Sequence, residues 1–296
     1  MTPTKASRED RIFNTISYIV LSLVLCIMLF PIINIVARSF SSTEANIKGI
    51  VWLWPVEFSL RGYQKVFENP QVWSGYLNSI IITIVGTSIN LALTLTAAYA
   101  LSRKDFFGRN VVMSLFVFTL LFNGGLIPTY LLVRNLGMLN TRWALVLPNA
   151  VVVYNVIVTR TFFQTTIPDE LLEASHLDGC SDFRFFRSVV LPLSGPIIAV
   201  IALWYAVGHW NSYFQALIYI RNERLFPLQI ILRNILLENR VDNFDELAPE
   251  EWAERIGLAM LLKYSLIIIA SVPVLMLYPF IQKYFVKGVM IGSLKG

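Results

Sequence analysis

The chain has 296 residues and a formal net charge of +5, and 56% of its residues are hydrophobic. Charged residues make up only 15%, whereas they are about 25% of a typical soluble domain. This composition excludes a disordered chain, a collagen-like repeat, a disulfide scaffold and an ordinary soluble enzyme. Lysines and arginines are scattered singly, without a basic stripe among aromatic residues, so nucleic acid is not an expected partner.

Six segments are long and apolar enough to be membrane helices. A helix needs about 20 mostly apolar residues to cross the hydrocarbon core, because each residue advances it by about 1.5 Å. The sequence therefore predicts an all-α polytopic protein with a six-helix transmembrane domain at 12–285, in contact with the lipid bilayer. The N-terminus is expected at 1–11 and the C-terminal tail at 286–296. The predicted spans are 12–37, 76–101, 111–133, 143–163, 195–220 and 258–285.

An even number of spans places both ends of the chain on one side of the membrane. Lysine and arginine favour the cytoplasmic side, but here they are divided almost equally between the two sets of loops. Their density is higher in the termini and in the loops on the same side, because the opposite loops are longer. We therefore expect both termini to be cytoplasmic.

The predicted spans contain no aspartate or glutamate. Proton-coupled carriers and ion pumps usually place such groups at mid-membrane. A stand-alone secondary carrier is one alternative function, but this sequence lacks the acidic groups that such a carrier usually places there. A second alternative, a membrane enzyme acting on lipid-linked sugar, needs clustered acids or a metal triad at a membrane face. His176 and His209 lack metal-ligand spacing, so we expect no metal site. The sequence also has no GxxxxGK[ST] loop, so it predicts no enzyme activity or bound cofactor in this chain.

The fifth predicted span carries the richest set of polar and aromatic side chains. Tyr205, His209 and Tyr213 have the i, i+4 spacing that places residues on one helix face. Aromatic faces beside amides and hydroxyls suit sugar rings, so we interpret this set as lining a substrate path. The alternative is an aromatic belt at the membrane interface with a histidine bonded to a neighbouring helix. The candidates are Trp204, Tyr205, His209, Trp210, Asn211 and Tyr213.

Helix-breaking residues interrupt the third span at 123–125 and Pro128, and the fourth span at 147–149. Broken helices are tolerated in membranes where protein or a water-filled cavity supports the freed backbone groups. Simple kinks at the prolines are the alternative. On the first interpretation, three more residues line the substrate path: Asn123, Asn149 and Asn155.

The loop at 164–194 is expected to form a helix, a glycine turn and a second helix. Thr166 and Asp169 have capping-box spacing, which predicts the start of the first helix. Gly179 is placed to end that helix in the left-handed conformation. Ser181 or Asp182 can then cap the second helix.

The same loop carries a recognisable motif. Glu173-Ala174-Ser175 is followed after three residues by Gly179, and after nine more by Val189-x-Leu191-Pro192. This pattern resembles the E-A-A, G, I-x-L-P loop of the inner-membrane permeases of ABC importers, with serine for the second alanine and valine for isoleucine. The resemblance implies a cytoplasmic coupling helix that docks in a cleft of a partner ATPase. The coupling residues it implies are Glu173, Ala174, Ser175, Asp178, Gly179, Leu191 and Pro192.

The resemblance extends over nearly the whole chain and is strongest to the maltose-importer class. Residues 123–130, 210–213 and 227–229 are similar to a subgroup associated with alginate- or pectin-type fragments. The C-terminus is similar to the tail that reaches between the ATPase subunits in the maltose class, which implies a coupling role for Lys295 and Gly296. A basic tail held by anionic lipid is the alternative.

The implied fold is the type I ABC importer transmembrane domain in the bacterial cytoplasmic membrane. The implied partners are a second permease, expected to be non-identical, two ATPase subunits that bind ATP and Mg, a periplasmic or extracellular solute-binding protein, and an oligosaccharide. The last outer loop contains acids that either face a binding protein or are simply solvated. It also contains arginines of interest for an acidic sugar: Arg221, Arg224, Arg233 and Arg240.

Overall fold

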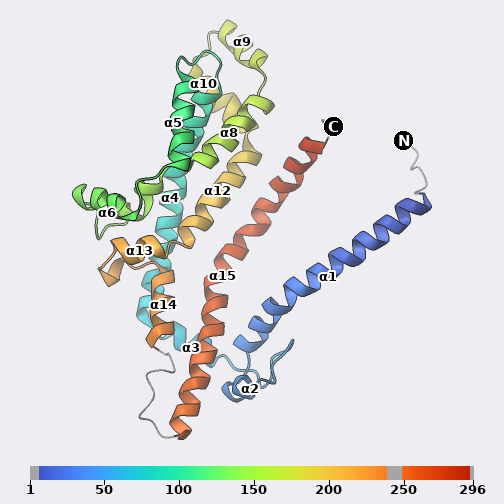
Figure 1. Cartoon of the computed structure of the whole chain (residues 1–296), viewed down its shortest axis with the longest axis vertical. Helices are drawn as coiled ribbons and strands as arrows, with labels where there is room; N and C mark the ends of the chain where they lie inside the picture. Colours follow the sequence, from blue (N-terminus) through green and yellow to red (C-terminus); the bar gives the residue numbers. More distant parts are fainter. Residues whose placement is uncertain (1–6, 239–248, 294–296) are drawn as a thin grey trace. The chain divides into compact units, whose positions relative to one another are not determined.

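The computed structural model describes residues 7–238 and 249–293, and every regular element in these ranges is a helix (Figure 1). This agrees with the predicted all-α class. Several residues singled out in the sequence lie outside the described ranges. They are Arg240, Lys295, Gly296 and three of the acids of the last outer loop, Asp242, Asp245 and Glu246.

Three helices are long and apolar enough to cross a membrane alone, and the described residues contain up to six spans if each of three bent helix pairs counts as one. The α-helices are α1 (Arg8–Ser39), α2 (Thr43–Ile47), α3 (Arg61–Phe67), α4 (Pro70–Ser102), α5 (Arg109–Leu121), α6 (Leu126–Asn135), α7 (Trp143–Val146), α8 (Val153–Thr166), α9 (Asp169–Leu177), α10 (Asp182–Phe185), α11 (Leu191–Leu193), α12 (Gly195–Trp210), α13 (Phe214–Tyr219), α14 (Leu228–Glu238) and α15 (Pro249–Ser293).

The third predicted span, 111–133, is not one helix. The interruption expected at Asn123 is confirmed, and the axes of α5 and α6 differ by 114° across it. Gly125 has φ +84°, a conformation that glycine adopts without steric cost. The Asn123 side-chain oxygen accepts a hydrogen bond from the Gly125 N–H at 2.9 Å, which stabilises a turn in place of helix.

The fifth predicted span, 195–220, is also not one helix. It divides into α12 and α13, and α12 has 16 residues. A helix of this length is about 24 Å long, shorter than the hydrocarbon core of about 30 Å. The Asn211 side chain donates to the Val207 carbonyl at 2.9 Å and so helps end α12. The fourth span bends by 54° at the 3₁₀ turn Leu147–Asn149, where the sequence predicted an interruption.

The chain divides into two compact units, one of residues 1–69 with 234–271 and one of 70–233 with 272–296. In the first, the Ser39 hydroxyl hydrogen-bonds the Tyr63 hydroxyl at 2.8 Å, and the Arg38 guanidinium lies over the Tyr264 ring. The most apolar 18-residue window of α1 has no buried residue. This helix therefore offers its apolar surface to lipid or to a partner.

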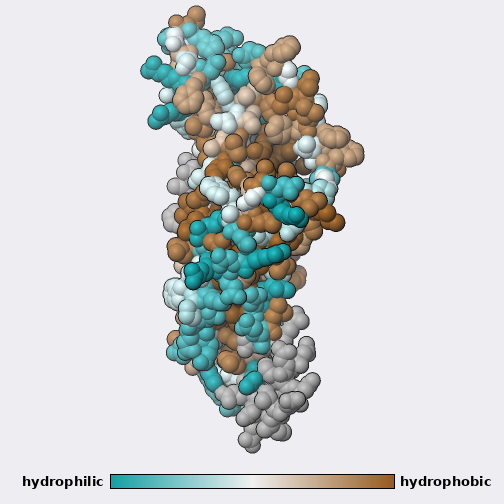
Figure 2. Space-filling model, turned by 90° about the vertical axis from the view of Figure 1, so that its left-hand side faces the viewer, coloured by the Kyte–Doolittle hydropathy of each residue, from teal (hydrophilic) through white to brown (hydrophobic). Residues whose placement is uncertain are grey.

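In the second unit α4 packs against α8 and α12 (Figure 1). Its core contains Ala98, Phe163, Phe185 and Ile201, all of them fully buried or nearly so. Hydrophobic side chains are also widely exposed on the surface (Figure 2), as expected of a protein whose solvent includes lipid. The α4–α8–α12 packing positions the cavity and the loop described next.

Candidate functional site

A cavity of about 430 Å³ lies in the second unit, beside the breaks in the fourth and fifth predicted spans. Five of the nine predicted substrate-path residues line it, and they come from two segments of the chain, 149–155 and 204–209. Its lining consists of Asn90, Leu145, Asn149, Val152, Tyr154, Asn155, Trp204, Tyr205, Gly208, His209, Ser212 and Gln215.

Side chains of the cavity satisfy backbone groups that the break in the fourth span leaves free. The Tyr205 hydroxyl accepts a hydrogen bond from the Val152 N–H at 3.2 Å and also bonds the Thr94 hydroxyl at 2.7 Å. The Asn90 amide donates to the Asn149 carbonyl at 3.4 Å. This is the protein support that a broken membrane helix requires.

The chemistry of the cavity wall is polar, aromatic and without fixed charge. Among its described lining residues there is no acid, lysine or arginine. The Tyr154 and Trp204 rings lie side by side, with centroids 5.7 Å apart. Buried polar atoms at the wall, Asn90 Oδ1 and Ser212 Oγ, have no hydrogen-bond partner in the described protein. Such a wall suits an uncharged ligand with apolar faces and many hydroxyls.

The structure does not bring the other four candidates to this cavity. Asn123 instead forms the turn before α6, and Asn211 ends α12. The Trp210 ring lies near the Tyr76 ring, and Tyr213 lies under the Arg233 guanidinium. Because α12 ends at Trp210, the i, i+4 spacing from His209 does not extend to Tyr213. Substrate contact stays a prediction for all nine residues.

The sequence reasoning missed Asn90, Tyr154 and Gln215. Asn90 had a detectable signal, because an amide in the middle of an apolar span is costly unless it finds a partner. Tyr154 and Gln215 gave no such signal. They reach the cavity only because the chain changes direction just before α8 and α13.

In the loop at 164–194, the predicted capping box is wrong. Helix α8 continues to Thr166, and Pro168 becomes the residue before α9 without a side-chain cap. Asp169 pairs instead with Lys104, whose Nζ lies 2.6 Å from its Oδ2. This hydrogen bond lowers the pKa of Asp169 and raises that of Lys104. The pair is therefore intact at neutral pH. It is lost as the pH falls through the lowered pKa of Asp169, and again as the pH rises through the raised pKa of Lys104.

The predicted glycine turn is confirmed. Gly179 has φ +71°, and its N–H donates to the His176 carbonyl at 3.0 Å. The Cys180 N–H donates to the Ser175 carbonyl at 2.9 Å, so the last carbonyls of α9 are satisfied. The Ser181 hydroxyl caps α10, as expected.

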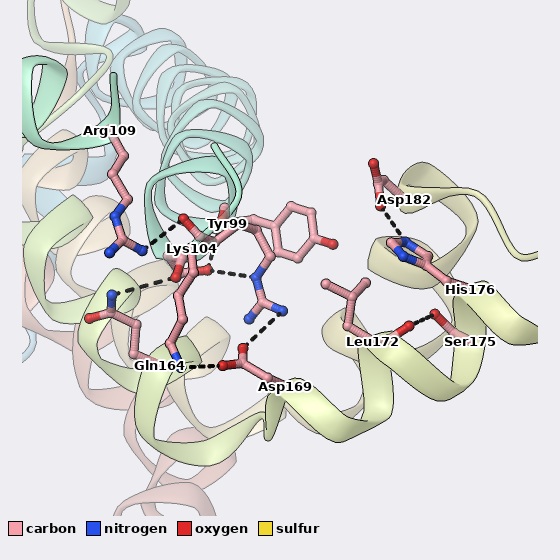
Figure 3. Close-up of polar contacts among 11 residues, drawn as sticks. Tyr99, Lys104, Arg109, Gln164, Asp169, Leu172, Ser175, His176 and Asp182 are labelled. Carbon is pink, nitrogen blue, oxygen red and sulfur yellow. Dashed lines mark hydrogen bonds and ion pairs between the residues drawn. The ribbon is translucent and has the colours of Figure 1, made fainter. Parts of the chain in front are cut away.

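The C-terminal end of α4 lies near the loop at 164–194 and is hydrogen-bonded to α5 and α8 (Figure 3). Its carbonyls at Leu101, Ser102 and Arg103 accept from side chains that belong to α8 and α5: Arg160 at 2.9 Å, Gln164 at 3.5 Å and Arg109 at 3.0 Å. The Asp169–Lys104 pair adds the first turn of α9 to this set. The end of α4, the end of α8 and the start of α9 are thus connected.

The two halves of the loop differ in burial. Most of the motif residues on α9 and its turn are exposed, and Leu177 is 91% exposed. Phe185 is fully buried, and the Phe186 ring packs against the Tyr99 ring with centroids 4.8 Å apart. The remaining motif residues are intermediate or exposed: Ser175, Leu191 and Pro192.

Residues 91–291 match the family model described as binding-protein-dependent transport system inner membrane component. The chain belongs to this family. It is 39% identical over 288 residues to the polygalacturonan/rhamnogalacturonan transport system permease protein YtcP of Bacillus subtilis (strain 168), covering 97% of this chain and 100% of that protein. It is 40% identical to Protein LplC of the same organism, covering 98% and 97%.

A solved structure is also similar: the crystal structure of a bacterial ABC transporter involved in the import of the acidic polysaccharide alginate. It is 33% identical, with a TM-score of 0.82, and the match covers 96% of this chain and 100% of that one. Family and fold therefore agree with the predicted ABC importer permease. The chain is a transport subunit and not an enzyme, and the carrier and membrane-enzyme alternatives are set aside.

Proposed function

We propose that the chain imports oligosaccharides or polysaccharide fragments, including acidic ones, across the bacterial cytoplasmic membrane, with both termini in the cytoplasm. The observation that carries this proposal is the cavity at the helix breaks, where the Tyr154–Trp204 ring pair lies beside amide and hydroxyl groups. The substrates in the names of the similar YtcP protein and the alginate transporter support the saccharide class.

The proposed assembly pairs this chain with a second, non-identical permease, two ATPase subunits that bind ATP and Mg, and a solute-binding protein at the outer loops. Glu173 is the proposed polar anchor to the ATPase, Ala174 and Ser175 allow close approach, and Gly179 provides the turn. The exposure of α9 supports this role. Asp178, Leu191 and Pro192 belong to the same motif, and Lys295 and Gly296 are proposed to reach the ATPase from the C-terminus.

Coupling then follows from the contacts of the loop. Movement of α9 with the ATPase is passed to the end of α4 through the Asp169–Lys104 pair. It is passed to the core of α4, α8 and α12 through buried Phe185 and Phe186. These three helices also carry cavity residues, so a shift of the loop changes access to the cavity.

The direct test reconstitutes the chain with the permease and ATPase encoded beside it, and measures ATP hydrolysis with candidate binding proteins. We expect stimulation by a binding protein loaded with an oligosaccharide. Failure of the complex to bind any ATPase removes the coupling proposal, and stimulation only by a non-saccharide ligand removes the substrate proposal.

A charge exchange tests the Asp169–Lys104 connection. Asp169→Lys is expected to reduce uptake roughly two- to fivefold, a modest effect because water screens an exposed ion pair. The exchange variant Asp169→Lys with Lys104→Asp is expected to recover most of the uptake in proteoliposomes.

The matched control is Glu170→Lys, which makes the same charge change one residue along α9, at an exposed side chain. We expect it to transport normally. An equal loss in this control, or no recovery in the exchange variant, shows that the pair does not transmit movement.

A further inference from the structure

A second cavity, of about 340 Å³, lies in the same unit at the ends of α6 and α13. It shares no lining residue with the first cavity. Its polar and aromatic lining comes from Tyr130, Arg134, Asn140, Tyr219 and Arg221, and two aliphatic side chains complete it. Nothing in the proposed coupling mechanism uses these residues.

Two aromatic rings, Tyr130 and Tyr219, line this cavity, and Tyr219 is anchored in the protein core. Tyr219 is 5% exposed and belongs to a buried cluster that includes Val133 and Ile220. The Tyr130 ring lies nearly parallel to the Tyr219 ring, at 13° with centroids 6.2 Å apart. Aromatic rings of this kind offer a flat apolar face beside a hydroxyl group.

Asn140 holds together the two segments that form the cavity wall. Its φ is +58°, a left-handed conformation that asparagine adopts more readily than most residues. Its N–H donates to the Tyr219 carbonyl at 3.0 Å, and its side-chain oxygen accepts from the backbone N–H groups of Arg221 and Asn222. The backbone that carries Arg221 is therefore fixed beside the cavity.

The two arginines at this cavity are exposed, and their guanidinium groups have no hydrogen bond or ion pair within the described residues. Three other arginines of the unit are engaged, since Arg142 donates to Asn78, Arg160 to Leu101 and Arg109 to Arg103. Guanidinium groups bind carboxylates through paired, charge-assisted hydrogen bonds. Two guanidiniums without a partner in the described part of the chain line one cavity with two aromatic rings, and this combination fits a sugar ring that bears a carboxylate.

We propose that this second cavity is a subsite for a uronate unit of the transported saccharide. The inference rests on the proposed function and assigns a different part of the saccharide to each cavity. The first cavity, without fixed charge, contacts ring faces and hydroxyls, whereas Arg134 and Arg221 contact the carboxylate. In the proposed orientation both arginines follow spans on the outer side, where the saccharide arrives.

The test compares trigalacturonate with its methyl ester, in which the carboxylate charges are removed and the sugar rings and hydroxyls are kept. Binding to the full complex in nanodiscs is measured by calorimetry at low ionic strength. The double variant R134Q/R221Q is expected to bind trigalacturonate about tenfold more weakly, through loss of charge-assisted hydrogen bonds at exposed groups. Its affinity for the methyl ester is expected to stay within about twofold of the wild type.

The matched control is R224Q. Arg224 is also of interest for an acidic sugar by sequence, but the structure leaves this exposed arginine of the same loop out of the cavity lining. It is expected to bind both ligands as the wild type does. Equal binding of trigalacturonate by the double variant and the wild type overturns the inference, as does an equal loss for both ligands. A wild-type complex that binds neither trigalacturonate nor its methyl ester also overturns the uronate subsite. The proposed function fails only if no saccharide-loaded binding protein stimulates ATP hydrolysis, so the two failures are distinguishable.

Discussion

Replacement of Leu177 by aspartate is expected to weaken binding of the ATPase by on the order of a hundredfold. Leu177 is 91% exposed at the last position of α9, beside the glycine turn. Burying a leucine side chain in a partner's cleft contributes about 1.5–3 kcal/mol, and a buried unpaired carboxylate opposes docking further. The affinity of purified ATPase for the permease complex in nanodiscs measures the effect, and uptake is expected to fall with it.

The control for this prediction is Phe107→Asp. Phe107 is 98% exposed in the loop between α4 and α5, on the same side of the protein but outside the coupling loop. This variant is expected to bind the ATPase normally. If both variants lose binding equally, the loss reflects surface hydrophobicity in general; if Leu177→Asp binds normally, α9 does not dock in the way proposed.

The second large effect is expected for Gly86→Ala in α4. A Cβ atom at Gly86 comes within 2.5 Å of His209 Nε2 and within 2.8 Å of two ring carbons, so the ring must move. Overpacking of this kind costs about 1–3 kcal/mol. Because His209 lines the first cavity, we expect a lower melting temperature together with loss of saccharide transport.

Gly208→Ala is the matched control for Gly86→Ala. Gly208 lines the same cavity, but a Cβ there meets no atom within 4 Å. Alanine also favours the helix by about 1 kcal/mol, so stability is expected to rise slightly. The double variant Gly86→Ala with His209→Ala removes the clash and is expected to recover the melting temperature. If Gly86→Ala and Gly208→Ala behave alike, close packing of the histidine ring is not the cause.

The local features of the coupling loop were predictable because short-range rules determine them. Gly179 ends α9 in the left-handed conformation, and Ser181 caps α10, as their positions indicated. The Thr166 cap failed for a tertiary reason: α8 continues through that residue, and Lys104, 65 positions earlier in the sequence, takes the carboxylate of Asp169.

Some of the helix breaks were predictable from the local sequence, and others were not. The breaks at Asn123 and Pro148 follow from residues that disfavour helix, and the sequence indicated both. The end of α12 at Trp210 was not predicted, although Gly208 lies in its last turn. Its stabilising contact, from Asn211 back to Val207, is visible only in the folded chain. Residue type singled out Asn149 and His209, which line the first cavity, and their contact with substrate stays a prediction. That Arg134 and Arg221 line one cavity depends on contacts between segments distant in the sequence.

The fastening of the α4 carbonyls has a mechanical consequence. Arg160, Gln164 and Arg109 occupy the carbonyls at the end of α4, so this end has little freedom to fray or stretch. A rigid, hydrogen-bonded helix end passes a displacement on to its neighbours with little loss, whereas a frayed helix end absorbs the displacement by becoming locally disordered. We therefore expect a movement of α9 to reach the cavity almost undiminished. Removing these hydrogen bonds is expected to lower the amount of sugar transported per ATP hydrolysed before it lowers the rate of ATP hydrolysis itself.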